Sequence, residues 1–170
     1  PIHRIAGKHS SFINVPHQMI ISGLVDTLPG EKVVIEILED AVPDDALFSA
    51  VKSMHEKGYQ LALDDFTLDI AWNRFMPYIS VIKFDVREKH QNEIFQYIKD
   101  NKPLLKGIQF LAEKVETREE YDRYCQAGFS LFQGFFFSRP EIMKNKCLSQ
   151  NPLTLSRLMM EVHRESPDFA

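Results

Sequence analysis

The chain has 170 residues, of which 44% are hydrophobic and 26% charged, as expected for one globular domain with a sizeable core. A formal net charge of -4 provides no basic surface for duplex nucleic acid, and no apolar run approaches the roughly 20 residues of a membrane span. Cys125 and Cys147 lack CxxC spacing. We therefore expect reduced thiols and a cytoplasmic protein, rather than a disulfide framework or a structural zinc site.

Short apolar runs recur along the chain and alternate with segments of helical periodicity. These runs are almost continuously apolar, which indicates strands of a parallel sheet that is covered on both faces. The sequence predicts strands at residues 12–15, 33–38, 60–65, 81–86, 107–111 and 131–137.

Helix signals lie between these runs. Pro43 and the acids after it predict the start of a helix that Gly58 ends, and Thr117 with Glu120 predicts a capping box for a helix that Gly128 ends. Repeated strand-helix units predict an α/β fold with a parallel sheet, either an open doubly wound sheet or a (β/α) barrel. The predicted strands are two short of a closed barrel.

Polar side chains interrupt the apolar runs near one end of each. A charge inside a strand that is buried on both faces costs several kcal/mol unless it is paired or metal-bound. In a barrel the strand ends converge at one mouth, where these side chains can meet. Hard oxygen ligands for Mg²⁺, Mn²⁺ or Ca²⁺ would come from Asn14, Glu36, Asp64 and Asp65, with Lys83 as a cation beside them.

Each residue alone also has a simpler explanation. An isolated acid at a strand end is more often a helix cap or a salt-bridge partner, as Glu36 or Glu113 would be. One of the adjacent Asp64 and Asp65 could cap a following helix, because neighbouring side chains of a strand point to opposite faces. Lys83 alone would be an ion-paired lysine. The joint occurrence of these residues on successive strands is what favours a metal site.

Four segments resemble, in order, the DDFG, IKxD, AEGVET and QGxxFxxP signatures of EAL domains: 61–66, 82–85, 112–117 and 133–140. EAL domains are bacterial phosphodiesterases of cyclic di-GMP, built as a modified TIM (β/α) barrel. The resemblance implies an EAL-like barrel over residues 1–140, lacking its first strands, with about six of eight present. Residues 141–170 resemble the connector and first helix toward an HDOD-like module, as in EAL-HDOD signalling proteins.

The resemblance also implies roles for individual residues. Two Mg²⁺ or Mn²⁺ ions would be cofactors for hydrolysis of cyclic di-GMP to linear pGpG. Lys83 would hold the nucleophilic water, and Glu113 would act as a ligand or general base. The implied metal ligands are Asn14, Glu36, Asp64 and Asp65, and the implied supporting or substrate-binding residues are Gln133, Glu116, Glu39 and Asp85.

Three departures from the pattern accompany this resemblance. The namesake Glu-Ala-Leu motif supplies a metal-binding glutamate, which nothing in Pro1 to Ser11 provides. Residues 67–72 replace a glycine-rich loop, and Lys114 stands where a glycine is usual. We therefore expect an N-terminally incomplete, degenerate domain that is inactive as given. The alternatives are a non-catalytic module that binds the dinucleotide or a protein and, less favoured, an unrelated barrel lyase. Possible partners are cyclic di-GMP, an HDOD module or signalling protein, and a second copy of the chain.

Overall fold

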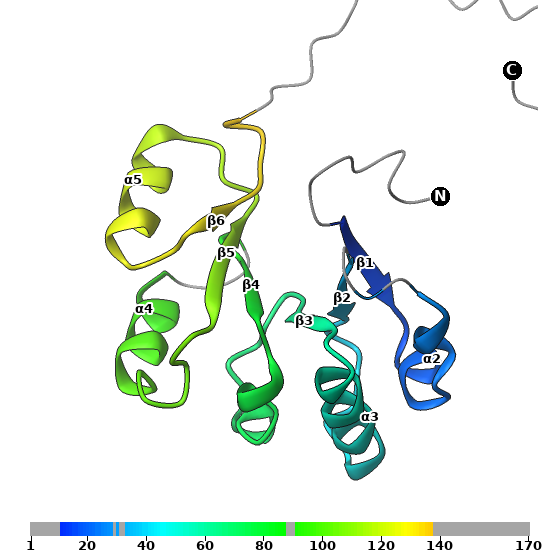
Figure 1. Cartoon of the computed structure of the whole chain (residues 1–170). Helices are drawn as coiled ribbons and strands as arrows, with labels where there is room; N and C mark the ends of the chain where they lie inside the picture. Colours follow the sequence, from blue (N-terminus) through cyan, green and yellow to red (C-terminus); the bar gives the residue numbers. More distant parts are fainter. Residues whose placement is uncertain (1–10, 29, 31–32, 88–90, 138–170) are drawn as a thin grey trace, which may run out of the picture. The chain divides into compact units, whose positions relative to one another are not determined.

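The computed structural model of the protein describes residues 11–28, 30, 33–87 and 91–137. Its centre is one sheet of parallel strands in which spatial order equals chain order, so every connection crosses the outer face in the same way. The sheet curves into a half-barrel, shown in Figure 1. The strands are β1 (Ser11–Val15), β2 (Val33–Ile37), β3 (Gln60–Leu63), β4 (Val81–Asp85), β5 (Gln109–Glu113) and β6 (Leu131–Phe132).

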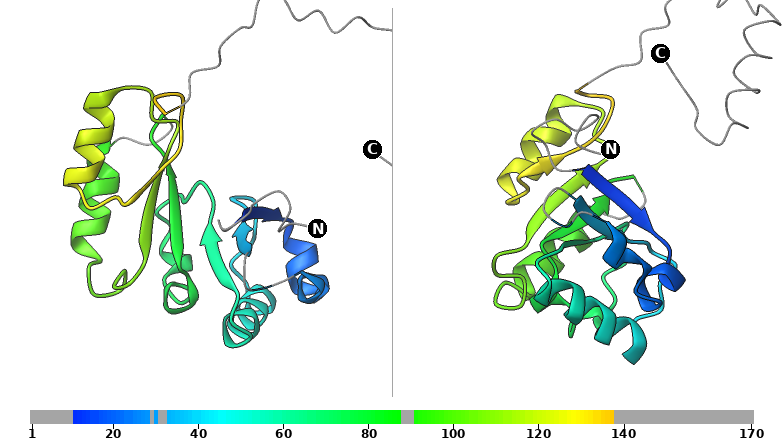
Figure 2. Two further views of the ribbon diagram at one scale, coloured as in Figure 1. Left: turned by 45° about the horizontal axis from the view of Figure 1, so that its top comes forward. Right: turned by 45° about the vertical axis from the view of Figure 1, so that its right-hand side comes forward.

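Helices follow the strands and lie along the outer face of the curved sheet, as Figures 1 and 2 show. This is the predicted α/β class, and it agrees with a barrel rather than with a sheet that has helices on both faces. The α-helices are α2 (His17–Ile21), α3 (Asp45–Glu56), α4 (Gln91–Asp100) and α5 (Arg118–Gln126), with 3₁₀ turns η1 (Leu24–Thr27), η3 (Ile70–Trp72) and η4 (Met76–Tyr78).

The predicted helix boundaries of α3 and α5 are confirmed by their caps. In α3, the Asp44 carboxylate accepts a hydrogen bond from the Leu47 amide at 2.8 Å, a contact that contributes about 1 kcal/mol. The helix ends before Gly58, whose φ of 88° suits glycine. In α5, Thr117 and Glu120 form both hydrogen bonds of a capping box.

The two faces of the sheet bury different side chains because side chains alternate along each strand. Outward-facing residues such as Ile35, Ile82 and Phe84 join the main core under the helices. Inward-facing residues form a smaller apolar cluster composed of Val34, Ala62, Val81 and Leu111, with Leu131 packed against it. This inner cluster is the floor of the barrel, and the polar residues two positions further along each strand lie above it.

The predicted strand over residues 131–137 is wrong beyond Phe132, because the chain turns at Gly134. The Val115 amide donates to the Gln133 carbonyl at 3.0 Å, and the Phe136 amide donates to the Val115 carbonyl at 3.0 Å. A Cβ atom on Gly134 would lie 2.2 Å from the Val115 carbonyl oxygen, so only glycine permits this close approach. The apolar run therefore continues past the strand as a turn that is hydrogen-bonded to Val115, two residues after β5.

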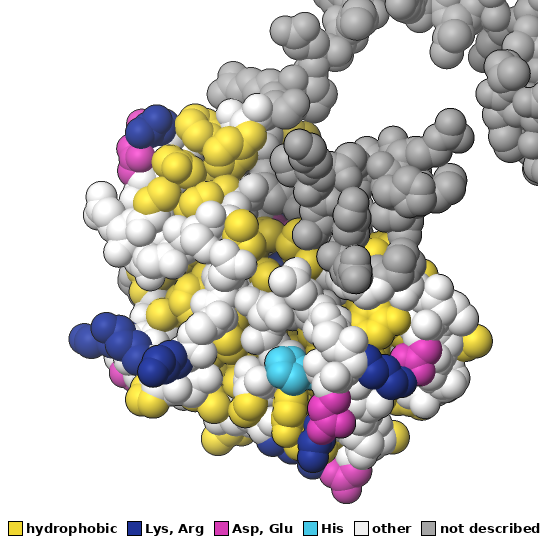
Figure 3. Space-filling model, in the orientation of Figure 1, with side chains coloured by type: hydrophobic (Ala, Val, Ile, Leu, Met, Phe, Trp, Pro, Cys, Tyr) yellow, Lys and Arg dark blue, Asp and Glu magenta, His cyan; other side chains and the backbone are white. Residues whose placement is uncertain are grey.

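Aromatic rings gather where α5 meets β6 and the turn after it. The Tyr121 ring lies 4.6 Å from the Phe132 ring and 5.8 Å from the Phe136 ring, and Phe137 is half exposed. Figure 3 shows hydrophobic side chains at the surface over this end of the molecule.

Contacts divide the chain into Pro1–Arg139 and Pro140–Ala170, and the second unit lies outside the described residues. The connector predicted for residues 141–170 therefore remains a prediction. In the part of the chain that the structure describes, no helix has the length and apolar character needed to cross a bilayer.

Candidate functional site

Lys83 is the centre of the polar cluster at the carboxyl ends of the strands. Its Nζ atom lies 2.9 Å from Glu36 Oε2, 2.6 Å from Asp64 Oδ1 and 3.0 Å from Glu113 Oε1. These acids come from β2, the segment after β3, and β5, so one ammonium joins three neighbouring parts of the sheet. The simple ion-pair explanation for Lys83 alone does not account for three carboxylates around it.

The cluster is buried and carries excess negative charge. Only 7% of the Lys83 side chain is exposed, and 5% of the Glu36 side chain. Three carboxylates share one ammonium, so the ionised cluster has a net charge of about -2 before Asp65 is counted. A site of this kind favours the uptake of protons or of a divalent cation.

The electrostatics of the cluster follow from this burial. Burial raises the pKa of Glu36 and of Glu113 above the ordinary value of 4.5, and Lys83 only partly offsets the increase. Burial by itself would lower the pKa of Lys83, but hydrogen bonds to Asp64 and Glu36 and the charge of Glu113 outweigh it and raise this pKa. Lys83 is therefore ammonium at neutral pH.

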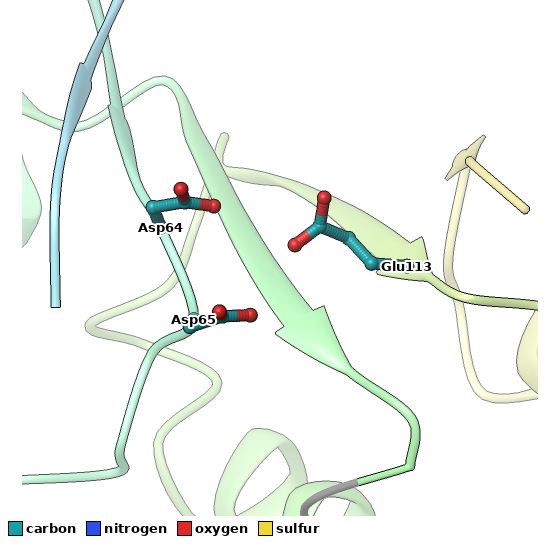
Figure 4. Close-up of side chains that lie close together, drawn as sticks. All are labelled: Asp64, Asp65 and Glu113. Atoms are coloured by element: carbon teal, nitrogen blue, oxygen red, sulfur yellow. The ribbon is translucent and has the colours of Figure 1, made fainter. Parts of the chain in front are cut away.

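Asp64 and Asp65 both face Glu113, although they are neighbours in the sequence. They follow β3 rather than ending it, and Asp65 has a φ of 39°, so the strand alternation does not apply to them. Figure 4 shows the three carboxylates turned toward one another across β4. Each residue offers an oxygen that lies within 4.8 Å of the oxygens from the other two.

This spacing fits a shared hard cation. Oxygens that share one Mg²⁺ or Ca²⁺ lie about 2.0 to 2.6 Å from the ion, and therefore within about 4 to 5 Å of one another. Asp64, Asp65 and Glu113 satisfy this condition. Carboxylate oxygens are also the donor type that Mg²⁺, Mn²⁺ and Ca²⁺ prefer. The donor set therefore fits a divalent ion in ligand type and in approximate spacing.

A second ionic network lies beside the cluster and joins the segments after β4 and β5. Buried Asp85 pairs with Lys114 and also accepts a hydrogen bond from the Arg87 amide at 2.7 Å. The Arg87 guanidinium lies 3.1 Å from Glu116 and 2.9 Å from Glu120 at the start of α5. The resemblance gave Arg87 no role, and its sequence signal is only its position two residues after Asp85.

Lys114 has a left-handed backbone conformation, with a φ of 58°. A glycine adopts this conformation without cost, whereas an ordinary residue loses about 1 kcal/mol. A lysine in place of glycine at this position therefore strains the backbone and, in return, forms an ion pair with a buried acid.

The remaining predicted residues lie around the cluster rather than in it. Asn14 is exposed on β1, opposite Glu36 in the strand register. Gln133 is exposed after β6. Glu39 lines a small cavity together with Asp64, Asp65 and Thr67. The volume of this cavity, about 10 Å³, is close to that needed by one water molecule. The roles assigned to all of these residues remain predictions.

Comparison with known sequences finds related proteins, while no family model matches the chain. The chain is 40% identical over 166 residues to a cyclic di-GMP phosphodiesterase, CdgJ, of Vibrio cholerae, covering 98% of this chain and 38% of that protein. The chain spans about two fifths of the length of the curated relatives that it matches.

Solved structures share the fold. An EAL domain protein from Listeria monocytogenes has a TM-score of 0.64 at 21% identity, with 95% of this chain and 68% of that chain covered. The YkuI protein of Bacillus subtilis, solved with cyclic di-GMP and calcium, has a TM-score of 0.62 at 16% identity, covering 88% of this chain and 42% of that one. The chain is therefore related in sequence to a cyclic di-GMP phosphodiesterase and shares the fold of EAL-domain proteins.

Proposed function

We propose that the chain is part of a cyclic di-GMP signalling protein whose site binds the dinucleotide and hydrolyses it to linear pGpG. The observation that carries this proposal is the convergence of Asp64, Asp65 and Glu113 beside Lys83. The phosphodiesterase relative and the cyclic di-GMP complex of a structural neighbour support the choice of substrate. The whole protein's activity is part of the proposal, because the chain spans only 38% of that relative.

Magnesium or manganese is the proposed cofactor. Asp64, Asp65 and Glu113 would hold the ion, with Glu36 and Asn14 as further ligands. When bound, such an ion lowers the pKa of a water molecule and stabilises charge on phosphoryl oxygens. The excess negative charge around Lys83 is the driving force for cation uptake.

Lys83 and Glu113 would perform the proton chemistry. The raised pKa of Lys83 keeps it an ammonium, which can donate a hydrogen bond to an attacking water or to a phosphoryl oxygen. Burial raises the pKa of Glu113 above 4.5 in the absence of a cation, and Glu113 would act either as a metal ligand or as a general base. Glu36 would keep the Lys83 side chain in place while its contacts to the other acids change.

The second candidate function is a non-catalytic module that binds the dinucleotide or a protein partner and conveys its state to an HDOD module. Lys83 favours this alternative, because one buried ammonium already bridges three acids and can hold them together without a metal. In either case we place the domain in the cytoplasm. A homodimer is the proposed assembly.

Manganese binding and turnover by the whole protein distinguish these functions. We expect calorimetry to detect Mn²⁺ binding and chromatography to detect pGpG, and Asp65→Asn to abolish both. Asp40→Asn, a change at an exposed aspartate, is the matched control and should bind Mn²⁺ and form pGpG as the unmodified protein does. Binding of cyclic di-GMP without turnover would support the non-catalytic module. Equal turnover by the parent and Asp65→Asn would contradict the proposed hydrolysis.

A further inference from the structure

An open groove of about 380 Å³ lies between the outer surfaces of α4 and α5, away from the polar cluster at the mouth. Phe95, Ile98 and Ala127 provide apolar surface in it. Ile98 is buried, and the Phe95 ring packs edge-on against Tyr124 at 5.2 Å, so these side chains have fixed positions. The groove therefore offers apolar contact on a rigid base.

Cations surround this apolar surface. Lys99, Lys102 and Arg123 line the groove and are exposed. Figure 3 shows Lys and Arg side chains gathered over the region that Figure 1 labels α4. The lining residues include no acid, so the charge at the groove is positive although the chain as a whole carries -4.

These cations differ from most others in the described residues. Lys57, Arg74 and Arg118 each form a salt bridge with a nearby acid. Within the described ranges, Lys99, Lys102 and Arg123 form none, and Arg123 instead donates a hydrogen bond to the neutral amide of Gln91. Among the other described cations, the exposed Lys52 on α3 and Lys106 after α4 likewise form no salt bridge with a described acid. Cations without ion pairs are therefore concentrated at the groove, where an anionic partner would compensate them.

We propose that the α4–α5 groove docks an acidic segment of a partner protein, with an apolar side chain inserted between the helices. The apolar surface separates this occupant from free phosphate, which has no use for Phe95 and Ile98. The concave shape favours a side chain over a flat bilayer. The few cations and the negative net charge disfavour duplex nucleic acid. Acidic amphipathic segments combine the two chemistries that the groove presents.

The experiment measures binding of labelled peptides to the whole protein by fluorescence anisotropy, without any nucleotide. The probe is a short helical peptide in which Asp and Glu surround two leucines spaced to lie on one face. Two companion peptides replace the acids by lysine or the leucines by serine. We expect the acidic peptide to bind, both companions to bind at least about tenfold more weakly, and added salt to weaken binding.

Charge reversal locates the site. Lys102→Glu combined with Arg123→Glu should weaken binding of the acidic peptide at least about tenfold, because both cations line the groove. Lys52→Glu is the matched control and should change binding less than about twofold. All three residues are exposed, so we expect the variants to fold as the unmodified protein does, and circular dichroism checks this.

Three results would overturn the proposal: no binding of the acidic peptide up to about 1 mM, equal loss of affinity in Lys52→Glu and the groove variant, or binding to phosphatidylserine vesicles without binding to the peptide. None of them bears on the metal cluster, so failure here is separate from failure of the proposed phosphodiesterase.

Discussion

Polar residues in the middle of the sheet differ from those at its two edges in burial and in ion pairing. Glu36, Lys83 and Glu113 on the middle strands are buried and joined by salt bridges, whereas Asn14 on β1 and Gln133 after β6 are exposed. Within the described residues, a middle strand has neighbours on both sides that supply partners, while an edge strand has one. In this site the ion-paired residues of the strands lie on strands that have a described neighbour on both sides.

Removal of the Lys83 ammonium gives the largest expected change in the free energy of unfolding. Lys83→Met would leave Glu36, Asp64 and Glu113 buried without their ammonium, at a cost of about 3 to 5 kcal/mol in the free energy of unfolding. Urea denaturation at neutral pH measures this, with the exposed Lys52→Met as control. An unchanged midpoint would show that the middle of the sheet does not depend on this ion pair, and the comparison would fail.

The turn after β6 provides the next effect, at the sheet edge. Gly134→Ala places a methyl group against the Val115 backbone and should destabilise the protein by about 1 to 3 kcal/mol. Gly58→Ala is the matched control: its φ is also positive, at 88°, but nothing lies near the new Cβ atom. That variant isolates the backbone cost, about 1 kcal/mol. Equal thermal shifts for the two variants would mean that the close approach contributes nothing.

Titration of the central acids sharpens the comparison further. Because the pKa values of Glu36 and Glu113 are raised above 4.5, the folded protein binds more protons than the unfolded chain in the window just above that value. The free energy of unfolding attributable to these groups therefore falls as pH rises through this window. Denaturation at a series of pH values should show a shallower fall for Glu113→Gln. A steeper fall in that variant would contradict the assigned direction.

The edge residues give the smallest expected effect. Asn14→Ala and Gln133→Ala should change the free energy of unfolding by less than about 0.5 kcal/mol, because both side chains are exposed. Differential scanning fluorimetry without added metal is sufficient. A large destabilisation by either change would show that an edge is as ordered as the middle.

Most of the fold could be predicted from the sequence because its signals are local. Apolar runs give the middle strands to within two residues, and caps such as Asp44 and Thr117 give helix starts. The last strand was predicted too long because the apolar residues after Phe132 pack as a turn on Val115. Apolar content alone does not distinguish these two arrangements.

The candidate site was partly predictable for a different reason. Parallel strands bring their carboxyl ends to one edge, so Glu36, Lys83 and Glu113 could be grouped before the structure was known. The orientation of the Asp65 side chain could not be predicted from the sequence, because it depends on a left-handed backbone conformation at that residue. The ionic contacts of Arg87 also depend on tertiary proximity, since its partners Glu116 and Glu120 come from a later segment.

The tight contact at Gly134 also restricts how the final strand can slide. A shift of β6 by one or two residues would bring a side-chain-bearing neighbour of Gly134 against the Val115 backbone, where no Cβ atom fits. Such slippage is the usual weakness of a strand with a single partner. The alignment of Leu131 and Phe132 with β5 is therefore locked by sterics, whatever lies along the other side of that strand.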